Sequence, residues 1–344
     1  MSEHLKIGIS MGDPNGIGAE VVIKSLSDKR ITELCTPIIF GSSKLLSHTK
    51  KVMNIQDFNF HVARDMQQIR ENWVNVIQSW KGDFQVNYGV LDPRAGEFAR
   101  ASLDACIEAG KKGEIDAMVT APFSKYAIQS ENFQFPGHTE YLAEHFSENK
   151  KNLMILASGD LRVALVTGHL PIREVADHLK GELIESKIKL FAKSLRQDFG
   201  VRKPKIAVFA LNPHAGDSGR LGSEEKEIIT PSIEKFKDEK FLVYGPFAAD
   251  GFFGQADYKK YDGVLAMYHD QGLAPFKALS FGNGVNFTAG MSIIRTSPDH
   301  GTAMAIAGQG IADESSMREA LYFALDRVRV RKGEKDLIAK SMEG

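Results

Sequence analysis

The sequence has few cysteines and no long hydrophobic segment. Its two cysteines, Cys35 and Cys106, are too few for a disulfide-stabilised scaffold or a cysteine zinc cluster. No run of eighteen or more apolar residues occurs, which excludes an ordinary membrane-spanning helix. The first residues lead directly into a strand-like segment, without a basic region followed by an apolar one, so we expect no secretory signal. These absences predict a cytoplasmic protein that does not bind membranes.

An excess of charge of either sign is also lacking. Lys and Arg number 43 and Asp and Glu number 44, a balance that argues against a broad surface for nucleic acid or anionic lipid. Apolar residues make up 43% and charged residues 25% of the chain, as in ordinary globular proteins. A chain of 344 residues is long enough for two packed lobes.

Short apolar runs rich in β-branched residues alternate with segments of helical period. In one such segment Ile184, Ile188, Phe191 and Leu195 are spaced by four, three and four. The alternation indicates an α/β fold with a mostly parallel sheet, arranged as two lobes with a cleft between them. The predicted strands are Lys6–Met11, Pro37–Phe40, Ala117–Thr120, Leu153–Ala157, Val163–Thr167, Lys205–Leu211 and Gly263–Tyr268.

Irregular stretches rich in Gly, Pro, Asn, His and Asp follow several of these strands. In α/β sheets, ligands gather beyond the carboxyl ends of strands, so we expect the functional residues there. The stretches are 12–18, 121–139, 212–223, 269–277 and 282–302.

Three histidines share one setting, because His169, His214 and His269 each follow a predicted strand. Three neutral imidazoles suit a divalent metal ion with positions left open for substrate. Asp270 could orient His269 or add a ligand. For any one histidine alone, a loop residue hydrogen-bonded to backbone is the better explanation, and the short His-Glu-x-x-His spacing is absent; the shared placement of the three makes a metal site an equal alternative.

A second group of residues would bind anions. Three residues combine a compact positive charge, a neutral hydrogen-bond donor and a guanidinium that can donate two parallel hydrogen bonds; they are Lys277, Asn286 and Arg295. This combination suits a phosphate and a carboxylate. His138 and Thr139 open a predicted helix whose N–H groups and dipole favour an anion. A solvated Lys, a surface Arg and a helix-capping Thr are the simpler interpretations of the same residues.

A glycine-rich turn, Gly12 to Gly18, follows the first strand. Its spacing does not match Gly-x-Gly-x-x-Gly, so an ordinary Rossmann phosphate loop is excluded. A tight turn that requires positive φ accounts for these glycines without any ligand.

Six segments in the same order resemble the 4-hydroxythreonine-4-phosphate dehydrogenase (PdxA) family over nearly the whole chain. The segments are Gly12-Asp13-Pro14-Asn15-Gly16-Ile17-Gly18, Pro136-Gly137-His138-Thr139-Glu140, Thr167-Gly168-His169, Leu211-Asn212-Pro213-His214-Ala215-Gly216, Tyr268-His269-Asp270-Gln271-Gly272 and Arg295-Thr296-Ser297-Pro298-Asp299-His300-Gly301-Thr302-Ala303.

The resemblance assigns roles to particular residues. It implies a metal site of His169, His214 and His269 for one divalent ion, with zinc, magnesium and cobalt all open. It implies a substrate site whose residues are His138, Thr139, Lys277, Asn286 and Arg295. It also implies a homodimer with the active site at the subunit interface and metal ligands shared between chains. Asp270 and Lys277 are the candidates for proton transfer.

A more distant likeness to isocitrate and isopropylmalate dehydrogenases implies a dinucleotide site built from both ends of the chain. The candidate residues are Gly16, Gly18, His300, Gly301 and Thr302. On this basis we expect residues 1–120 and 275–344 to form an NAD-binding lobe. Residues 121–274 are then expected to form the metal, substrate and dimerisation lobe.

The resemblance implies NAD- or NADP-dependent oxidation of 4-phosphohydroxy-L-threonine at C3 and decarboxylation to 3-amino-2-oxopropyl phosphate, in pyridoxal phosphate biosynthesis. An alternative substrate is another phosphorylated four-carbon acid, such as threonate or erythronate 4-phosphate. A metal-dependent phosphoester hydrolase would leave the residue 300–302 loop without a role. A non-catalytic small-molecule binding protein would leave three metal ligands unused.

Overall fold

The computed structural model describes residues 4–343 except 81, 83, 130–132, 134, 136, 238 and 240. The chain divides into unit 1, Met1–Lys151 with Met291–Val328, and unit 2, Asn152–Gly290 with Arg329–Gly344. The predicted α/β class is confirmed. The boundaries at 151/152 and 290/291 lie further along the chain than the expected 120/121 and 274/275. The reason is that α6 (His138–Phe146) packs on α4 (Pro93–Lys111) and β11 (Val285–Ala289) pairs with β6 (Leu153–Ser158). A third boundary at 328/329, which was not expected, groups the end of the chain with unit 2.

The strands of unit 1 lie in the order β3-β4-β2-β1-β5-β12, and every neighbouring pair is parallel. All residues of β2 and β5 are buried, as expected for parallel strands covered on both faces. The strands are β1 Leu5–Ser10, β2 Cys35–Gly41, β3 His61–Ala63, β4 Asn75–Gln78, β5 Ala117–Thr120 and β12 Ile294–Pro298.

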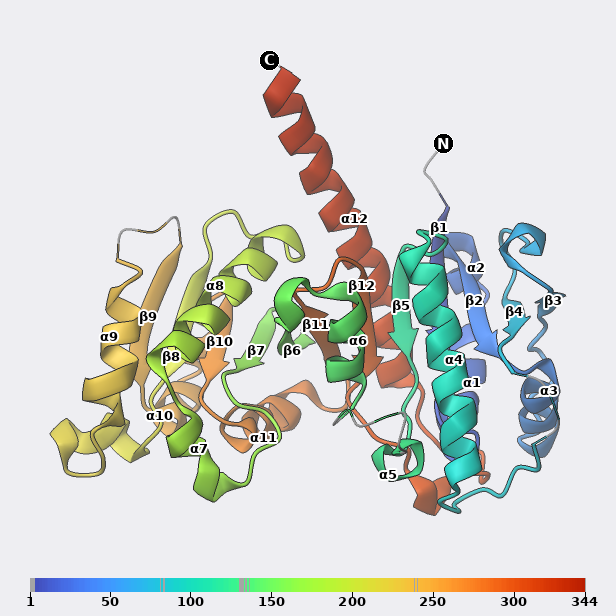
Figure 1. The fold of residues 1–344 in the computed structure, drawn as a ribbon, viewed down its shortest axis with the longest axis horizontal. Coiled ribbons are helices and arrows are strands. Elements are labelled where there is room, and N and C mark those ends of the chain that lie inside the picture. The colour runs from blue at the N-terminus through green and yellow to red at the C-terminus, as the bar shows by residue number, and fades with distance from the viewer. Residues whose placement is uncertain are drawn as a thin grey trace. The chain divides into compact units, whose positions relative to one another are not determined.

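The longest helix within unit 1, α4, packs against β1, β2 and β5 and lies in front of them in Figure 1. The Asp92 carboxylate accepts a hydrogen bond from the Arg94 N–H, and Pro93 occupies the first turn, so α4 begins with two favourable start signals. The other helices are α1 Gly18–Leu26, α2 Arg30–Leu34, α3 Ser43–Val52, α5 Lys125–Ile128, α6, and the first part of α12 Ser315–Glu343.

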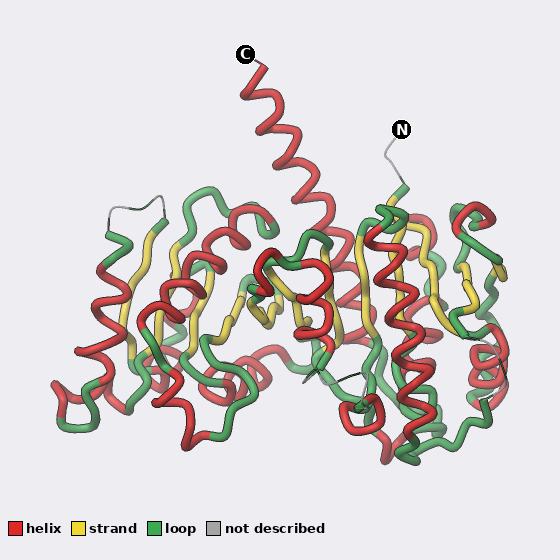
Figure 2. The backbone as a smooth tube through the Cα atoms, viewed as in Figure 1, coloured by secondary structure: helices red, strands yellow, loops and turns green. Residues whose placement is uncertain are grey.

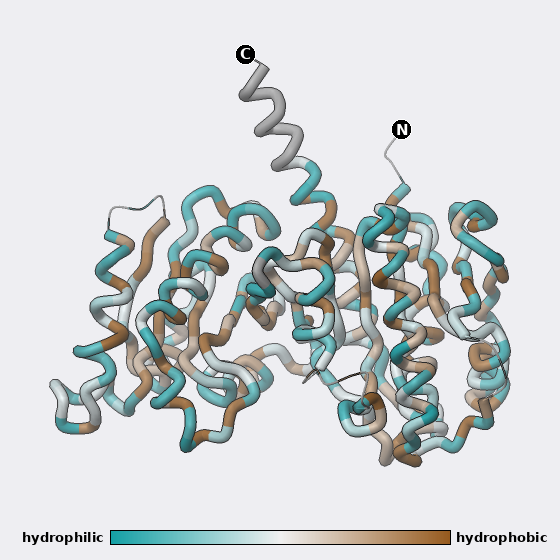
Figure 3. Tube along the Cα trace, in the orientation of Figure 1, coloured by the Kyte–Doolittle hydropathy of each residue, from teal (hydrophilic) through white to brown (hydrophobic). Residues whose placement is uncertain are grey.

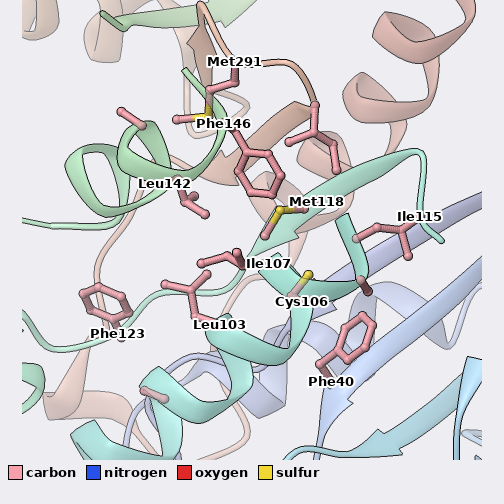
Figure 4. Close-up of a cluster of buried hydrophobic side chains, with 14 of the residues drawn as sticks. Phe40, Leu103, Cys106, Ile107, Ile115, Met118, Phe123, Leu142, Phe146 and Met291 are labelled. Carbon is pink, nitrogen blue, oxygen red and sulfur yellow. The ribbon is translucent and has the colours of Figure 1, made fainter. Parts of the chain in front are cut away.

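The core of unit 1 lies between α4, α6 and the sheet. Figure 4 shows Leu103, Cys106 and Ile107 of α4 facing Met118 of β5, with Phe146 of α6 beside them. Cys106 is fully buried there, and burial raises the pKa of its thiol. Cys106 therefore serves as a small core residue.

The strands of unit 2 lie in the order β11-β6-β7-β10-β8-β9. The pairs from β7 to β9 are parallel, whereas β11 with β6 and β6 with β7 are antiparallel. Gly159, at φ 54°, and Asp160 connect β6 to β7 in a two-residue turn that reverses the chain. The remaining strands are β7 Leu161–Leu165, β8 Lys205–Phe209, β9 Leu242–Phe247 and β10 Gly263–Ala266.

From β8 to β11 each strand of unit 2 is followed by one or more helices before the next strand, as the tube coloured by secondary structure shows (Figure 2). Hydrophobic and hydrophilic segments alternate along α8, as expected for a helix with one buried face (Figure 3). The helix predicted from the spacing of Ile184, Ile188, Phe191 and Leu195 is confirmed as α8, and all four residues are buried. The helices are α7 Ile172–His178, α8 Gly181–Gln197, α9 Thr230–Glu234, α10 Ala249–Gly254, α11 His269–Ser280 and the π-helix Glu225–Ile229.

All seven predicted strands are present, but the structure contains further strands that were not predicted. The stretch 282–302, expected to be irregular, contains β11 and β12. Each of these strands has only five residues; β11 lies between Gly284 and Gly290, and β12 ends in Pro298, which hid the strand pattern. Strands β3, β4 and β9 were also missed. In the described part of the chain, no helix combines the length and apolar content needed to cross a bilayer.

Candidate active site

Two of the three predicted metal-binding histidines lie side by side in unit 2. His169 follows β7 and His269 begins α11 directly after β10. Parallel pairing continues past these strands, because the Thr167 N–H and hydroxyl both donate to the Met267 carbonyl, the hydroxyl at 2.7 Å. The ring centres of His169 and His269 are consequently 5.6 Å apart. Adjacent strands therefore place both rings at the carboxyl edge of the sheet, where ligands are expected.

The chemistry of this histidine pair fits a divalent ion. Two imidazoles bound to one ion at about 2.0–2.1 Å from nitrogen have ring centres about 5–6 Å apart. His269 Nδ1 lies 2.7 Å from the Asp270 carboxylate, an arrangement that orients the ring and leaves Nε2 for an ion. Among the described residues no group of three His, Cys, Asp or Glu side chains is placed to hold a metal ion. A complete site therefore needs a ligand beyond this pair.

His214 lies on an unusual backbone turn. Five consecutive residues, His214 to Ser218, have φ between 41° and 78°, the left-handed region that costs about 1–2 kcal/mol for each non-glycine residue. Only Gly216 among them adopts it without strain. The His214 side chain is exposed. Strain of this kind persists only where the surrounding structure enforces it.

The remaining predicted residues of unit 2 lie on α11 and β11. Asp270 and Lys277 are both exposed and seven residues apart on α11, which puts them on one helix face about 10 Å apart along the axis. Asn286 on β11 is half-buried, and its side-chain oxygen is shielded from water without a hydrogen-bond donor among the described residues. An unsatisfied buried amide oxygen is costly, so this group is suited to accept a donor from a ligand.

In unit 1, Arg295 is a fully buried cation on β12. Its side chain is 2% exposed, and Nε and Nη2 donate to the Thr120 hydroxyl at 3.2 and 2.7 Å. Burial lowers the pKa of the guanidinium to about 10, and the Glu140 carboxylate partly opposes this shift. Arg295 stays charged at neutral pH, and a buried cation of this kind attracts an anion.

His138 lies close to Arg295 at the amino end of α6. Its ring stacks on Phe123 with ring centres 3.5 Å apart, and Nε2 is shielded from water without a partner among the described residues. Burial, and then the positive charges of Arg295 and Lys125, hold the pKa of His138 well below its usual value. Thr139 is the next residue of α6 and is half-buried, whereas Pro136 of the predicted motif lies outside the described residues.

The lowered pKa of His138 predicts a pH dependence of stability. Below about pH 6.5 the unfolded chain binds a proton at this residue that the folded chain does not bind. The free energy of unfolding should therefore fall as the pH drops below 6.5, by up to about 1.4 kcal/mol per pH unit from this residue. Urea denaturation without ligand should show a shallower decline for His138→Asn. The exposed His178 on α7 gives the control His178→Asn, and equal slopes for all three proteins would contradict the prediction.

The glycine-rich turn and the residue 300–302 loop lie together in unit 1. The Ile17 N–H donates to the Thr302 carbonyl at 3.1 Å, and a Cβ on Gly16 would lie only 2.9 Å from that oxygen. The Gly16 N–H is bonded to the Asp13 carbonyl, so these amides are already used within the protein. The predicted contact between the two ends of the chain is thus present, with Gly16 allowing the close approach.

His300 and Gly301 form the outer part of this loop. His300 Nδ1 lies 3.1 Å from the Gly301 carbonyl, and His300 Nε2 is shielded from water without a partner among the described residues. A Cβ on Gly301 would meet nothing within 4 Å. Gly18, in contrast, is enclosed, because a Cβ there would lie 2.4 Å from the Met11 carbonyl oxygen.

Residues 33–324 match the family model described as "Pyridoxal phosphate biosynthetic protein PdxA". The chain belongs to the PdxA family. It is 49% identical over 331 residues to a Bacteroides thetaiotaomicron protein named 4-hydroxythreonine-4-phosphate dehydrogenase, covering 96% of this chain and 91% of that protein. It is 39% identical to an Oceanobacillus iheyensis protein named, provisionally, D-threonate 4-phosphate dehydrogenase, covering 95% and 98% of the two chains.

A crystal structure of the Klebsiella pneumoniae 4-hydroxythreonine-4-phosphate dehydrogenase has the same fold as this PdxA-family chain. The TM-score is 0.83 and the sequence identity 32%, over 95% of this chain and all of the other. Membership of this family makes the protein an oxidoreductase.

Three residues of the site in this PdxA-family protein were not predicted from the sequence. Gln271 accepts from the Met267 N–H at 2.7 Å and donates to the Ala210 carbonyl at 2.6 Å, which ties the ends of β10 and β8. Glu225 contacts the loop of His214. Lys125 lies at the amino end of α6, because a Cβ on Gly137 would be 4.0 Å from its Nζ. Gln271 is part of the Tyr268–Gly272 segment that matched the family, so its role could have been predicted. No local sequence pattern marked Glu225 or Lys125 as a residue of the site.

Proposed function

We propose that this protein catalyses the NAD- or NADP-dependent oxidation of 4-phosphohydroxy-L-threonine at C3. Loss of carbon dioxide then gives 3-amino-2-oxopropyl phosphate, a step of pyridoxal phosphate biosynthesis. The observation that supports the proposal best is the pairing of His169 with an Asp270-oriented His269 at adjacent strand ends. An imidazole oriented by a carboxylate is typical of metal-binding histidines, which supports a metal-assisted reaction.

The substrate's two anionic groups call for positive and donor groups, and the predicted substrate residues are of these types. In unit 1, Arg295, His138 and Thr139 would bind an anion, with Lys125 adding a second charge near the start of α6. In unit 2, Lys277 and Asn286 are the corresponding groups. Holding phosphate and carboxylate at separate points would fix C3 in one orientation.

We assign the metal ligands to His169, His214 and His269, contributed by two copies of the chain in a homodimer. Zinc, magnesium and cobalt all remain candidates for the ion. Gly16, Gly18, His300, Gly301 and Thr302 would border the dinucleotide, so unit 1 is the proposed NAD-binding unit. When bound, the ion would supply a Lewis acid that lowers the pKa of the substrate hydroxyl, and a nicotinamide would supply the hydride acceptor for C3.

Asp270 and Lys277 are the residues that we propose to move protons. Asp270 and Lys277 share one exposed face of α11, two turns apart. One takes the proton from the C3 hydroxyl as that carbon is oxidised. After carbon dioxide leaves, the enol carbon needs a proton, and the other residue can donate it.

A second candidate substrate is D-threonate 4-phosphate, which the name of the Oceanobacillus iheyensis relative suggests. Both compounds carry a phosphate, a carboxylate and an oxidisable hydroxyl. The residues assigned above to anions would serve either one, so the difference would lie in contacts to the amino or hydroxyl group at C2.

The test is to offer both substrates to the metal-loaded protein and follow NADH and NADPH formation at 340 nm. We expect the larger kcat/KM for 4-phosphohydroxy-L-threonine and loss of activity after treatment with a chelator, restored by one of the three ions. A larger kcat/KM for D-threonate 4-phosphate would transfer the proposal to the second candidate. Turnover of neither compound, or full turnover without any metal, would contradict the proposed chemistry.

A further inference from the structure

The loop that carries His214 is built around one buried carboxylate, that of Glu225. Glu225 is 6% exposed and opens the π-helix Glu225–Ile229. Its Oε1 accepts hydrogen bonds from the Leu211 and Asn212 N–H groups, both at 2.8 Å. Its Oε2 accepts from the Asn212 side-chain amide at 3.1 Å. Two backbone donors at the start of the loop thus depend on one side chain.

The left-handed turn fits closely against the same carboxylate. A Cβ on Gly216 would lie 2.6 Å from Glu225 Oε2, so a glycine is needed in the middle of the turn both for its φ of 78° and for space. On the other side, a Cβ on Gly222 would lie 2.3 Å from the Asn212 amide nitrogen, which also donates to Glu224 at 2.7 Å. The turn is therefore enclosed by Glu225 on one side and held by Asn212 at its base.

The base of the loop is also held relative to His269. Gln271, two residues after His269, donates to the Ala210 carbonyl at the end of β8. Ala210 directly precedes the two N–H groups that Glu225 binds. With this base fixed, the position of the His214 ring depends on the shape of the left-handed turn.

We propose that Glu225 is a positioning residue that holds the strained His214 turn in the shape needed for metal binding. The carboxylate saturates the donors of Leu211 and Asn212, which would otherwise draw the loop into a more relaxed backbone conformation. Glu225 itself does not touch the ion. The inference rests on the proposed role of His214 as a metal ligand, whereas the hydrogen bonds of Glu225 stand independently of that role.

The experiment is a calorimetric titration of the metal-free full-length protein with Zn²⁺ or Co²⁺, together with the absorption spectrum of the Co²⁺ complex. For Glu225→Ala we expect the Kd to rise by about 10–100-fold, the range found when residues that orient metal ligands are removed. Glu225→Gln keeps an oxygen that accepts both backbone N–H groups, so its Kd should stay within about threefold of the unmodified protein. Glu227→Ala, an exposed position on the same π-helix, is the matched control and should leave the Kd unchanged.

His214→Ala, titrated in parallel, distinguishes the proposed metal role of His214 from the proposed role of Glu225. If His214→Ala binds metal normally, the proposed metal role of His214 fails. If His214→Ala binds metal poorly but a folded Glu225→Ala binds it normally, only the role of Glu225 is overturned. Equal losses in Glu225→Gln and Glu225→Ala, or a loss in Glu227→Ala, would also overturn it. If Glu225→Ala does not fold, Glu225→Asp replaces it, because the shorter carboxylate cannot reach both donors and should raise the Kd likewise.

Discussion

Replacing His214 with alanine is expected to lower kcat/KM for 4-phosphohydroxy-L-threonine by about 1,000-fold or more. A Lewis-acidic ion stabilises the developing charge by several kcal/mol, and each 1.4 kcal/mol corresponds to about tenfold in rate. Removing one of three ligands should forfeit most of that stabilisation. The side chain is exposed on its turn, so its loss creates no cavity and the protein should remain folded.

The measurement combines NADH formation with metal content and the oligomeric state in solution. His178→Ala, an exposed histidine on α7, should behave like the unmodified protein in all three. Full activity of His214→Ala in the presence of a chelator would show that His214 does not serve a metal-dependent reaction. A fall in activity without loss of metal would instead place His214 next to the substrate rather than the ion.

Replacing Arg295 with methionine is expected to raise KM for the same substrate by about 100-fold, with a much smaller change in kcat. The guanidinium is fully buried, and two of its N–H groups donate to the Thr120 hydroxyl. A charge-assisted contact with phosphate or carboxylate contributes about 1.5–3 kcal/mol, consistent with that change in KM. Methionine preserves much of the buried volume without the charge, so folding should be retained.

Two further variants test the interpretation of Arg295. Thr120→Val leaves the guanidinium in place but removes the acceptor that orients it, and we expect a rise in KM of about tenfold or less. Arg100→Met, on the partly exposed side of α4 beside Asp104, should have no effect. An unchanged KM for Arg295→Met would remove Arg295 from the substrate site, and an equal rise for Arg100→Met would point to a general loss of positive charge instead.

The alternation of apolar runs and helical periods was sufficient to predict the α/β class and the position of β5 to the residue. Both signals are local: a buried parallel strand needs a continuous apolar run, and a helix with one buried face needs a period of 3.6. The same reasoning placed His169 and His269 just beyond strands, and their contact follows because β7 and β10 are parallel neighbours. The sequence order of these strands did not reveal that they are adjacent.

The unit boundaries were decided by contacts that no local pattern shows. α6 joins unit 1 because Leu142 and Phe146 pack into the core beneath α4, and β11 joins unit 2 because it pairs antiparallel with β6. Five-residue strands such as β11 and β12 carry too few alternating residues to be recognised. Their pairing depends on partners more than one hundred residues away in the chain.

By itself, the sequence determined the fold class, the family and the chemical types available at the site. The tertiary structure alone decided that Arg295 is buried, that its charge and that of Lys125 act on His138, and that His214 lies on a left-handed turn next to Glu225. The reason is physical: residue types and periods are properties of neighbouring positions, whereas desolvation, electrostatic interaction and backbone strain arise only when distant segments pack together.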